Sequence, residues 1–205
     1  MALEFSTLRI GTDNYDLKDL RARQQVEELK GKVDKELVTN LLNPTLKGST
    51  TINGITITAN GDGTYVLDGT CTAFVDIRLS PWGTSQYNQC LALKAGQYKL
   101  VGTPDLASVI HSHVGIVPND GVTRPTSYYD DGNGYILTHT DESVRYELKI
   151  SVNVGAVLDN VVFKPMLTTN LKATYEDYVP YTGSTGKLNS DLAELRKLIV
   201  GEMYP

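Results

Sequence analysis

Residues 43–180 alternate apolar and polar side chains in short runs, and turn-forming residues interrupt these runs at intervals of about eight to twelve positions. Strand side chains point to opposite faces in turn, so this rhythm predicts an antiparallel β-sandwich. No helical period of useful length lies between the runs, which argues against alternating βαβ units. The expected strands cover 50–59, 64–68, 70–79, 97–102, 109–117, 134–139, 144–152 and 157–166.

A helical pattern precedes this region, over residues 16–42. Asp16 is the expected N-cap, and Asn43-Pro44 the expected end, since the residue before proline disfavours the helical conformation. Apolar side chains recur at heptad spacing, with a stutter near Glu36. They are Ala22, Val26, Leu29, Val33, Leu37 and Leu41. A helix of this length spans about 40 Å, and the pattern predicts a stalk whose apolar edge is covered by copies of itself. The alternative is a helix folded back on its own β-domain.

The two ends of the chain carry short apolar patterns of their own. Residues 1–15 alternate briefly before a turn signal at 11–14, and a segment this short must pack on something else. Residues 181–186 read as a flexible connector, and 187–199 as a short helix with apolar positions four, three and four apart. We expect that helix, within the segment 181–205, to dock on a neighbouring surface, because about three turns are unstable alone in water.

Composition excludes several classes of protein. The net charge of -5, with the basic residues scattered, argues against nucleic acid as a partner. No apolar run reaches the length of a membrane-spanning helix, and the first residues do not resemble a signal peptide. Cys71 and Cys90 are expected to be buried thiols in a protein made in a reducing cytosol, with a bridge between them as the alternative.

Several stretches resemble virion proteins of bacteriophages. Residues 8–19 (LRIGTDNYDLKD) resemble the opening of phage minor structural proteins, in which a helix follows. The stretches 40–44 (NLLNP), 51–64 (TINGITITANGDGT), 67–70 (LDGT) and 93–102 (LKAGQYKLVG) are similar to a β-sandwich module of phage fibres and baseplate appendages. The stretches 163–167 (FKPML) and 175–181 (YEDYVPY) match the usual end of that module.

This resemblance implies a jelly-roll-like sandwich similar to carbohydrate-binding modules, in a homotrimer. The chain would divide into an attachment segment (1–15), a coiled-coil stalk (16–42), a β-sandwich head (43–180) and a linker with a docking helix (181–205). Contact with capsid, tail or baseplate proteins is expected at the N-terminal segment. The side chains expected to make it are Leu8, Ile10, Tyr15 and Leu17.

No pattern in the chain indicates catalysis. The acidic pairs Asp130-Asp131, Asp141-Glu142 and Glu176-Asp177 lie in turn-like contexts, where carboxylates usually bind their own backbone. There is no nucleophile elbow, phosphate loop or zinc-protease motif. We therefore expect neither an enzyme nor a cofactor.

Two kinds of residue group in the chain contain side chains that bind metal ions in other proteins. His111 and His113 share one face of a strand, with His139 as a third candidate ligand, and an ion at a trimer axis is a further alternative. Residues 60–63 and 130–133 contain oxygen ligands that suit calcium, but plain turns account for them better. The sequence predicts no metal site.

Aromatic side chains form the candidate contact surface. They could stack on the apolar faces of sugar rings while a neighbouring carboxylate binds the hydroxyls. The candidates are Trp82, Tyr87, Tyr128, Tyr129 and Asp130. The alternative is that Trp82 plugs the sandwich core and that the tyrosine pair are ordinary loop residues.

Together, these features predict a non-catalytic structural protein of the phage particle. The leading hypothesis is a trimeric head fibre that projects from the capsid and aids attachment to host glycans. A tail fibre or baseplate subunit is the alternative within this class. Rivals of another kind are a glycan-degrading enzyme or its accessory domain, and a decoration protein without a ligand.

Overall fold

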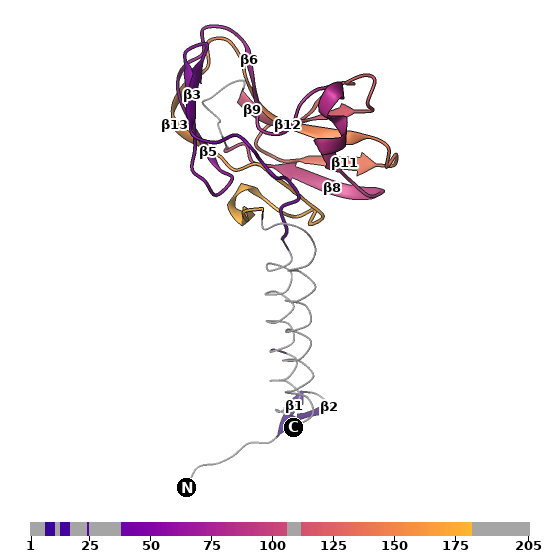
Figure 1. The fold of residues 1–205 in the computed structure, drawn as a ribbon. Coiled ribbons are helices and arrows are strands. Elements are labelled where there is room, and N and C mark those ends of the chain that lie inside the picture. Colours follow the sequence, from indigo (N-terminus) through magenta and orange to yellow (C-terminus); the bar gives the residue numbers. More distant parts are fainter. Residues whose placement is uncertain (1–6, 11–12, 17–23, 25–37, 106–111, 182–205) are drawn as a thin grey trace. The chain divides into compact units, whose positions relative to one another are not determined.

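The structure is a computed structural model, and it describes residues 7–10, 13–16, 24, 38–105 and 112–181 (Figure 1). The chain divides into two compact units, residues 1–38 and 39–205. In the first unit, β1 (Thr7–Ile10) and β2 (Asp13–Asp16) form an antiparallel hairpin in which Leu8 pairs with Tyr15. Asp16, the expected start of the helix, is thus the last residue of a strand.

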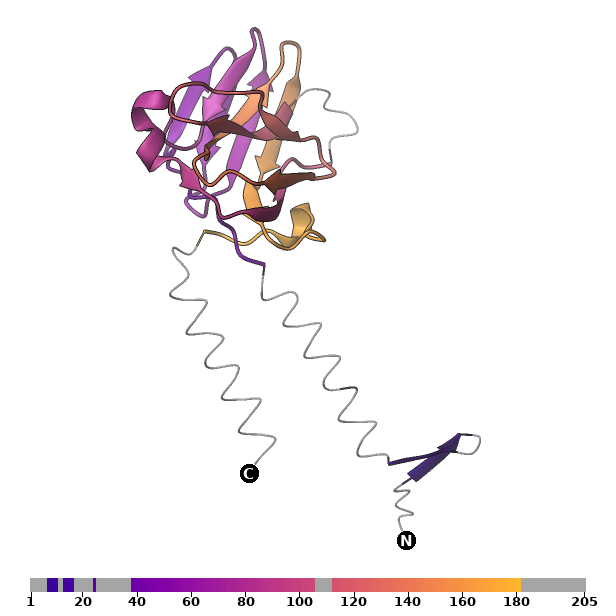
Figure 2. The ribbon, with the colours of Figure 1, turned by 90° about the vertical axis from the view of Figure 1, so that its right-hand side faces the viewer.

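The described residues of the second unit contain strands and two short 3₁₀ helices joined by loops (Figure 2). In chain order they are β3 (Ser49–Ile52), β4 (Ile55–Ala59), β5 (Tyr65–Thr70), β6 (Val75–Arg78), β7 (Leu91–Ala92), β8 (Gly96–Val101), β9 (Ser112–Asn119), β10 (Tyr128–Asp130), β11 (Tyr135–His139), β12 (Arg145–Val152), β13 (Val157–Phe163) and β14 (Met166–Thr168). Two short 3₁₀ helices, η1 (Thr84–Gln89) and η2 (Tyr175–Asp177), complete the described elements.

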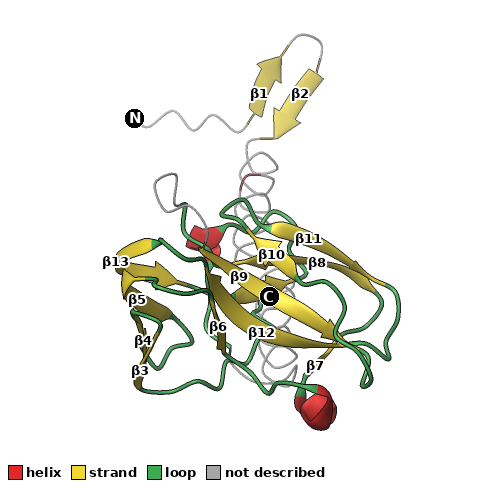
Figure 3. Ribbon diagram, turned by 90° about the horizontal axis from the view of Figure 1, so that it is seen from above, coloured by secondary structure: helices red, strands yellow, loops and turns green. Residues whose placement is uncertain are grey.

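These strands form three sheets, and every pairing among the described strands is antiparallel. One sheet has the order β13-β5-β4-β3, and another has the order β11-β8-β14. The largest has the order β10-β9-β12-β6, with β7 pairing on β12, and Figure 3 shows it from above. The prediction of a mainly β, antiparallel fold is confirmed.

A single apolar core is shared by the three sheets. Ile57 and Leu67 come from the first sheet, Leu100 from the second, and Ile116 and Ile150 from the largest. All five side chains are almost fully buried. Because alternate residues of each strand point into this core, the remaining residues of β6, β9 and β12 must lie on the opposite face of the largest sheet.

Turn chemistry explains why the strands end where they do. Asn53 and Gly54 both have positive φ, at 49° and 82°, and form the two-residue turn of the β3–β4 hairpin. This geometry suits the twist of paired strands, and asparagine followed by glycine adopts it readily. The stretch 50–59, which the alternation of apolar and polar residues predicted as one strand, is therefore divided by this turn into β3 and β4.

The structure corrects the expected end of the N-terminal helix. Residues 38–47 have no helical structure, although the predicted helix extended to residue 42. The Leu41 amide donates to the Leu167 carbonyl at 2.8 Å, and the Leu41 side chain packs against the core of its own β-domain. Asn40 fixes this path, because its amide donates to the Pro165 carbonyl at 2.9 Å.

Leu41 is therefore wrong as a stalk residue. The other five expected stalk positions (Ala22, Val26, Leu29, Val33 and Leu37) lie outside the described residues, as do Leu17 and the C-terminal helix. Gln24, which is described, is helical.

Candidate functional site

The face of the largest sheet that points away from the core carries polar and charged side chains. On β12, Tyr146, Leu148, Ile150 and Val152 belong to the core, so Arg145, Glu147, Lys149 and Ser151 lie on the opposite side. Glu147 and Lys149 are nevertheless 0% and 4% exposed. Buried charges require partners, because desolvation otherwise costs several kcal/mol. We call this side of the sheet the polar face.

Strand register places four residues of the polar face in one row across the sheet. Arg78 of β6 pairs with Lys149 of β12, Lys149 pairs with Gly115 of β9, and Gly115 pairs with Tyr129 of β10. A Cβ atom added at Gly115 would lie 2.8 Å from Cδ1 of Tyr129. The tyrosine ring therefore lies over the glycine, close to the sheet, with 36% of the residue exposed.

Polar groups surround the Tyr129 ring. The Lys149 ammonium lies 5.0 Å from the ring centroid and 3.0 Å from Oδ2 of Asp76. The Ser151 hydroxyl donates to Oδ1 of Asp76 at 2.6 Å. The His113 ring centroid lies 5.9 Å from that of Tyr129, and its Nδ1 has no hydrogen-bond partner among the described residues. An exposed aromatic ring thus sits beside a lysine, a carboxylate and an unsatisfied imidazole.

Electrostatics at Tyr129 follow from this setting. Burial raises the pKa of the phenol, but interactions with Lys149, Ser127 and Ser151 outweigh it and bring the pKa below its ordinary value of 10.0. The positive charge of Lys149 favours the phenolate. The ring is therefore held by contacts at its hydroxyl as well as by the glycine beneath it.

Trp82 lies next to this row and not in the apolar core, so the interpretation that it plugs the core is wrong. Arg78 places its guanidinium carbon 4.9 Å from the centroid of the Trp82 ring, and Arg124 places its own at 5.0 Å. The indole is half-buried, and its Nε1 has no hydrogen-bond partner among the described residues. Trp82 is thus an aromatic group in contact with two cations.

A buried network holds the loop that carries Trp82. Oε1 of Glu147 accepts from the Gly83 amide at 2.8 Å and from Nδ2 of Asn119 at 2.7 Å. Oε2 accepts no hydrogen bond in the described part of the chain, and the Arg124 guanidinium lies 3.6 Å from it. Gly83 has a φ of 90°, which glycine adopts without strain. Glu147 therefore fixes the position of Trp82 through its neighbour in the chain.

Tyr87 is occupied by contacts within its own chain. Its hydroxyl donates to the Ser143 carbonyl, and the Arg145 guanidinium lies 5.7 Å from the ring centroid. A Cβ atom added at Gly121 would lie 3.6 Å from the ring, so the loop that follows β9 passes close to it. The residue remains half-buried on η1. Tyr87 is better described as a support for this loop than as a contact residue.

Tyr128 and Asp130 do not join the polar face, because they alternate with Tyr129 along β10. Tyr128 packs against the core and stacks on Tyr135 with ring centroids 5.2 Å apart. Asp130 is 1% exposed and accepts backbone hydrogen bonds from Thr103, Gly132 and Gly134 at 2.7–2.9 Å. The structure thus separates the five predicted contact residues and leaves Trp82 and Tyr129 on the polar face.

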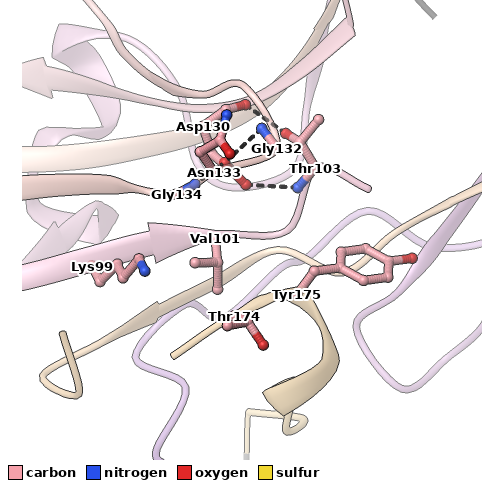
Figure 4. A pocket seen from close by; sticks show the side chains of 9 residues that line it. All are labelled: Lys99, Val101, Thr103, Asp130, Gly132, Asn133, Gly134, Thr174 and Tyr175. Carbon is pink, nitrogen blue, oxygen red and sulfur yellow. Dashed lines mark hydrogen bonds between the residues drawn. The ribbon is translucent and has the colours of Figure 1, made fainter. Parts of the chain in front are cut away.

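Asp130 does line a small pocket, which Figure 4 shows from close by. The pocket encloses about 200 Å³ between Asp130, Lys99 and Tyr175. Both carboxylate oxygens of Asp130 are already used by the backbone, so the carboxylate organises the turn into β11 and has little capacity left for a ligand. A larger pocket of about 450 Å³ lies beside residues 41–45 and includes Cys90 in its wall.

The other candidate chemistry lies in turns and in the core. Asp141 accepts from the Ser143 amide at 2.9 Å, and Asp177 from the Thr174 amide at 2.9 Å, as predicted for turn carboxylates.

His139 lies 2.9 Å from the Tyr146 hydroxyl in the core, away from His113 on the polar face, and His111 is outside the described residues. Within the described ranges, no group of three His, Cys, Asp or Glu side chains could hold a metal ion. Cys71 and Cys90 are both buried free thiols, as expected.

Sequence reasoning missed most of the polar face. Asp76, Lys149, Ser151 and Gly115 were not singled out, although β12 carries a polar residue at every second position from 145 to 151. These polar residues all lie on the side of β12 that points away from the core. Polar residues at every second position of a strand whose other side is apolar were the signal that could have predicted the polar face.

Comparisons with known proteins identify no family for the chain. No protein-family model matches the sequence, and no curated protein matches it either. Among solved structures, the chain is similar to one described as accessory secretory protein 1,2 and 3 in Streptococcus pneumoniae, at 15% identity and a TM-score of 0.42. The match covers 64% of this chain and 94% of that one. A TM-score this low supports no argument about fold or function. No helix in the described residues is long and apolar enough to cross a membrane.

Proposed function

We propose that this chain is a non-catalytic structural subunit of a bacteriophage particle whose β-domain binds glycans of the host surface. The leading form is a trimeric head fibre on the capsid, and a tail fibre or baseplate appendage is the alternative. The assignment to a phage particle is supported by the sequence resemblance of residues 8–19 and of the β-sandwich stretches.

The single observation that carries the glycan proposal is the position of Tyr129. Its ring is exposed and backed by Gly115, with the Lys149 ammonium and the Asp76 carboxylate close by. Sugar rings combine an apolar face with a rim of hydroxyls. An aromatic ring can cover that face while charged groups bind the hydroxyls.

Two finer features of the fold belong to this proposal. The three antiparallel sheets around one core are consistent with a jelly-roll-like head. The heptad pattern of residues 22–37 supports a coiled-coil stalk, even though Leu41 is part of the head. Three heads on one rod would bind three glycan sites at once, so that weak contacts add up to firm attachment.

A glycan-degrading enzyme is the rival of another class. Hydrolysis of a glycosidic bond needs two carboxylates on either side of the bond. On the polar face, Asp76 is bound to Lys149 and Ser151, and Glu147 is fully buried. This arrangement favours binding over hydrolysis.

The direct test is an array of host-wall and capsular glycans probed with the full-length protein. The proposal predicts selective binding of at least one glycan, without release of reducing sugar during prolonged incubation. Binding of no glycan would favour an architectural protein without a ligand, and release of sugar would favour the enzyme.

The particle and the trimer are tested separately. Antibody-labelled particles viewed by electron microscopy should show the protein on the capsid or the tail. Light scattering should give a trimeric mass for the full chain and a monomeric mass after Val26→Glu with Val33→Glu. The charge-matched control, Gln24→Glu with Gln25→Glu, lies off the heptad positions and should remain trimeric.

A further inference from the structure

The polar face carries more positive than negative side chains, in a chain whose net charge is -5. Arg78, Arg124, Arg145 and Lys149 lie on it or at its edge, against the two carboxylates of Asp76 and Glu147. Asp120, in the loop after β9, binds the amides of Val122 and Thr123 and is therefore engaged within its own turn. The local charge thus opposes the charge of the whole chain.

Two of these cations are not fully paired. Arg78 is exposed and has no carboxylate partner among the described residues, so its main contact is the Trp82 ring. Arg124 has one oxygen of Glu147 at 3.6 Å, and its side chain is 39% exposed. Both guanidinium groups keep N–H donors that no acceptor in the described part of the chain uses.

The built part of this site lies beneath the arginines. Glu147 is wholly buried, its Oε2 has no hydrogen-bond partner among the described residues, and the Arg124 guanidinium lies 3.6 Å from that oxygen. The Nε1 donor of Trp82 is also buried, and no residue that the structure describes accepts a hydrogen bond from it. A guanidinium binds a carboxylate or a phosphate through two parallel hydrogen bonds, and here two guanidinium carbons lie 4.9 and 5.0 Å from the centroid of one indole ring.

From this arrangement we propose that Arg78, Arg124 and Trp82 form a subsite for the acidic group of a glycan, a carboxylate or a phosphate. This inference rests on the proposed glycan-binding function and names the class of glycan. Tyr129 and Trp82 lie on the same face, since Arg78 contacts Trp82 and pairs in register with Lys149, which lies over Tyr129. The neutral part of the glycan would cover Tyr129 while its acidic group reaches the arginines.

The test is calorimetric titration of the full-length protein with three probes. They are a uronic-acid oligosaccharide, the same oligosaccharide with its carboxyl groups reduced to alcohols, and a glycerol-phosphate-linked glycan. At low salt, we expect one or both acidic probes to bind at least about tenfold more tightly than the neutral probe, because the guanidinium donors form charge-assisted hydrogen bonds with the acidic group alone. This advantage should shrink as salt is added.

Substitutions localise the effect. Arg78→Gln should reduce the ratio of acidic-probe to neutral-probe affinity from at least about tenfold to about one. Arg78 is exposed, so this variant is expected to fold. Lys172→Gln, which removes an exposed charge from the loop after β14, should change neither affinity.

Each outcome has a clear reading. If Arg78→Gln weakens binding of the uronic-acid probe alone, the subsite takes a carboxylate. If Arg78→Gln weakens binding of the glycerol-phosphate-linked glycan alone, the subsite takes a phosphate. Equal affinity for acidic and neutral probes, or no effect of Arg78→Gln, would overturn the acidic subsite while leaving glycan binding intact. Failure to bind any probe, together with a negative glycan array, would overturn the acidic subsite and the proposed function together.

Discussion

The ring of Tyr129 occupies the space that a side chain at Gly115 would need, since a Cβ atom there would lie 2.8 Å from Cδ1 of the ring. Contacts under 3.0 Å force a shift. Here the tyrosine can shift, because it is a partly exposed side chain on the edge strand of its sheet. The glycine thus sets the height of the aromatic ring above the sheet.

Gly115→Ala should displace the ring and weaken glycan binding by about two- to tenfold, with little change in stability, since aromatic contacts contribute about 0.5–1.5 kcal/mol. Ile136→Ala, on an exposed position of β11 in another sheet, is the control and should keep full affinity. Affinity and the urea midpoint would be measured for both variants. Unchanged glycan affinity in Gly115→Ala would contradict the role given to the Tyr129 ring.

Glu147 is expected to be one of the residues on which stability depends most. Glu147→Ala removes the acceptor of the Gly83 amide and one of the two acceptors of the Asn119 side-chain amide, and each unsatisfied buried donor costs about 1–3 kcal/mol. We expect the free energy of unfolding to fall by about 2–5 kcal/mol in urea titrations. Glu147→Gln retains an acceptor oxygen and should lose less. Equal losses in the two variants would show that the hydrogen bonds at Oε1 are not the source of stability.

Asp130 is expected to act in the fold and not in binding. In Asp130→Asn, the side-chain oxygen can still accept from the backbone amides of Gly132 and Gly134. The new side-chain NH₂ group, however, faces the backbone N–H of Thr103, which is also a donor. The variant should lose about 1–3 kcal/mol of stability and keep its glycan affinity. A loss of affinity at unchanged stability would instead place Asp130 in the binding site.

Alkaline pH should destabilise the β-domain through its buried tyrosines. Burial raises the pKa of Tyr65 to about 12, whereas an unfolded tyrosine titrates near 10. The stabilisation from this group is complete below about pH 10 and is lost as the pH rises towards 12, because the unfolded chain releases its proton first. Tyr65→Phe should therefore make the decline in unfolding free energy over this range less steep.

Tyr146 offers a second, independent site for the same measurement, because burial raises its pKa to about 12 as well. Tyr146→Phe should also flatten the decline. Urea titrations at a series of pH values between 9 and 12, with tyrosinate absorbance followed in parallel, give both slopes. Wild-type slopes in both variants would contradict the assignment of the alkaline transition to buried phenols.

The strand rhythm predicted most of the β-domain because local turn chemistry and alternation agree along β4, β5, β8, β11 and β12. The three-residue strands β10 and β14 were missed, since so short a run carries little alternation. Leu41 was assigned to the stalk because its spacing continues the apolar pattern, but the Asn40 side chain donates to the Pro165 carbonyl of its own β-domain and draws Leu41 onto the core.

The candidate site could be predicted only in part. Trp82 and Tyr129 stood out as aromatic residues in polar surroundings. Asp76 and Lys149 are far apart in the sequence and meet only through the pairing of β6 with β12. That register depends on long-range packing of the core, which one sequence without its structure does not specify.

The central claim, that the polar face binds glycan through Tyr129, is tested most directly by comparing two matched tyrosine variants. Tyr129 and Tyr181 are 36% and 37% exposed, but Tyr181 lies beside the larger pocket and not on the polar face. With a glycan selected on the array, calorimetry should show that Tyr129→Ala lowers affinity at least about tenfold while Tyr181→Ala retains the wild-type value. Equal affinities for the two variants would contradict the claim.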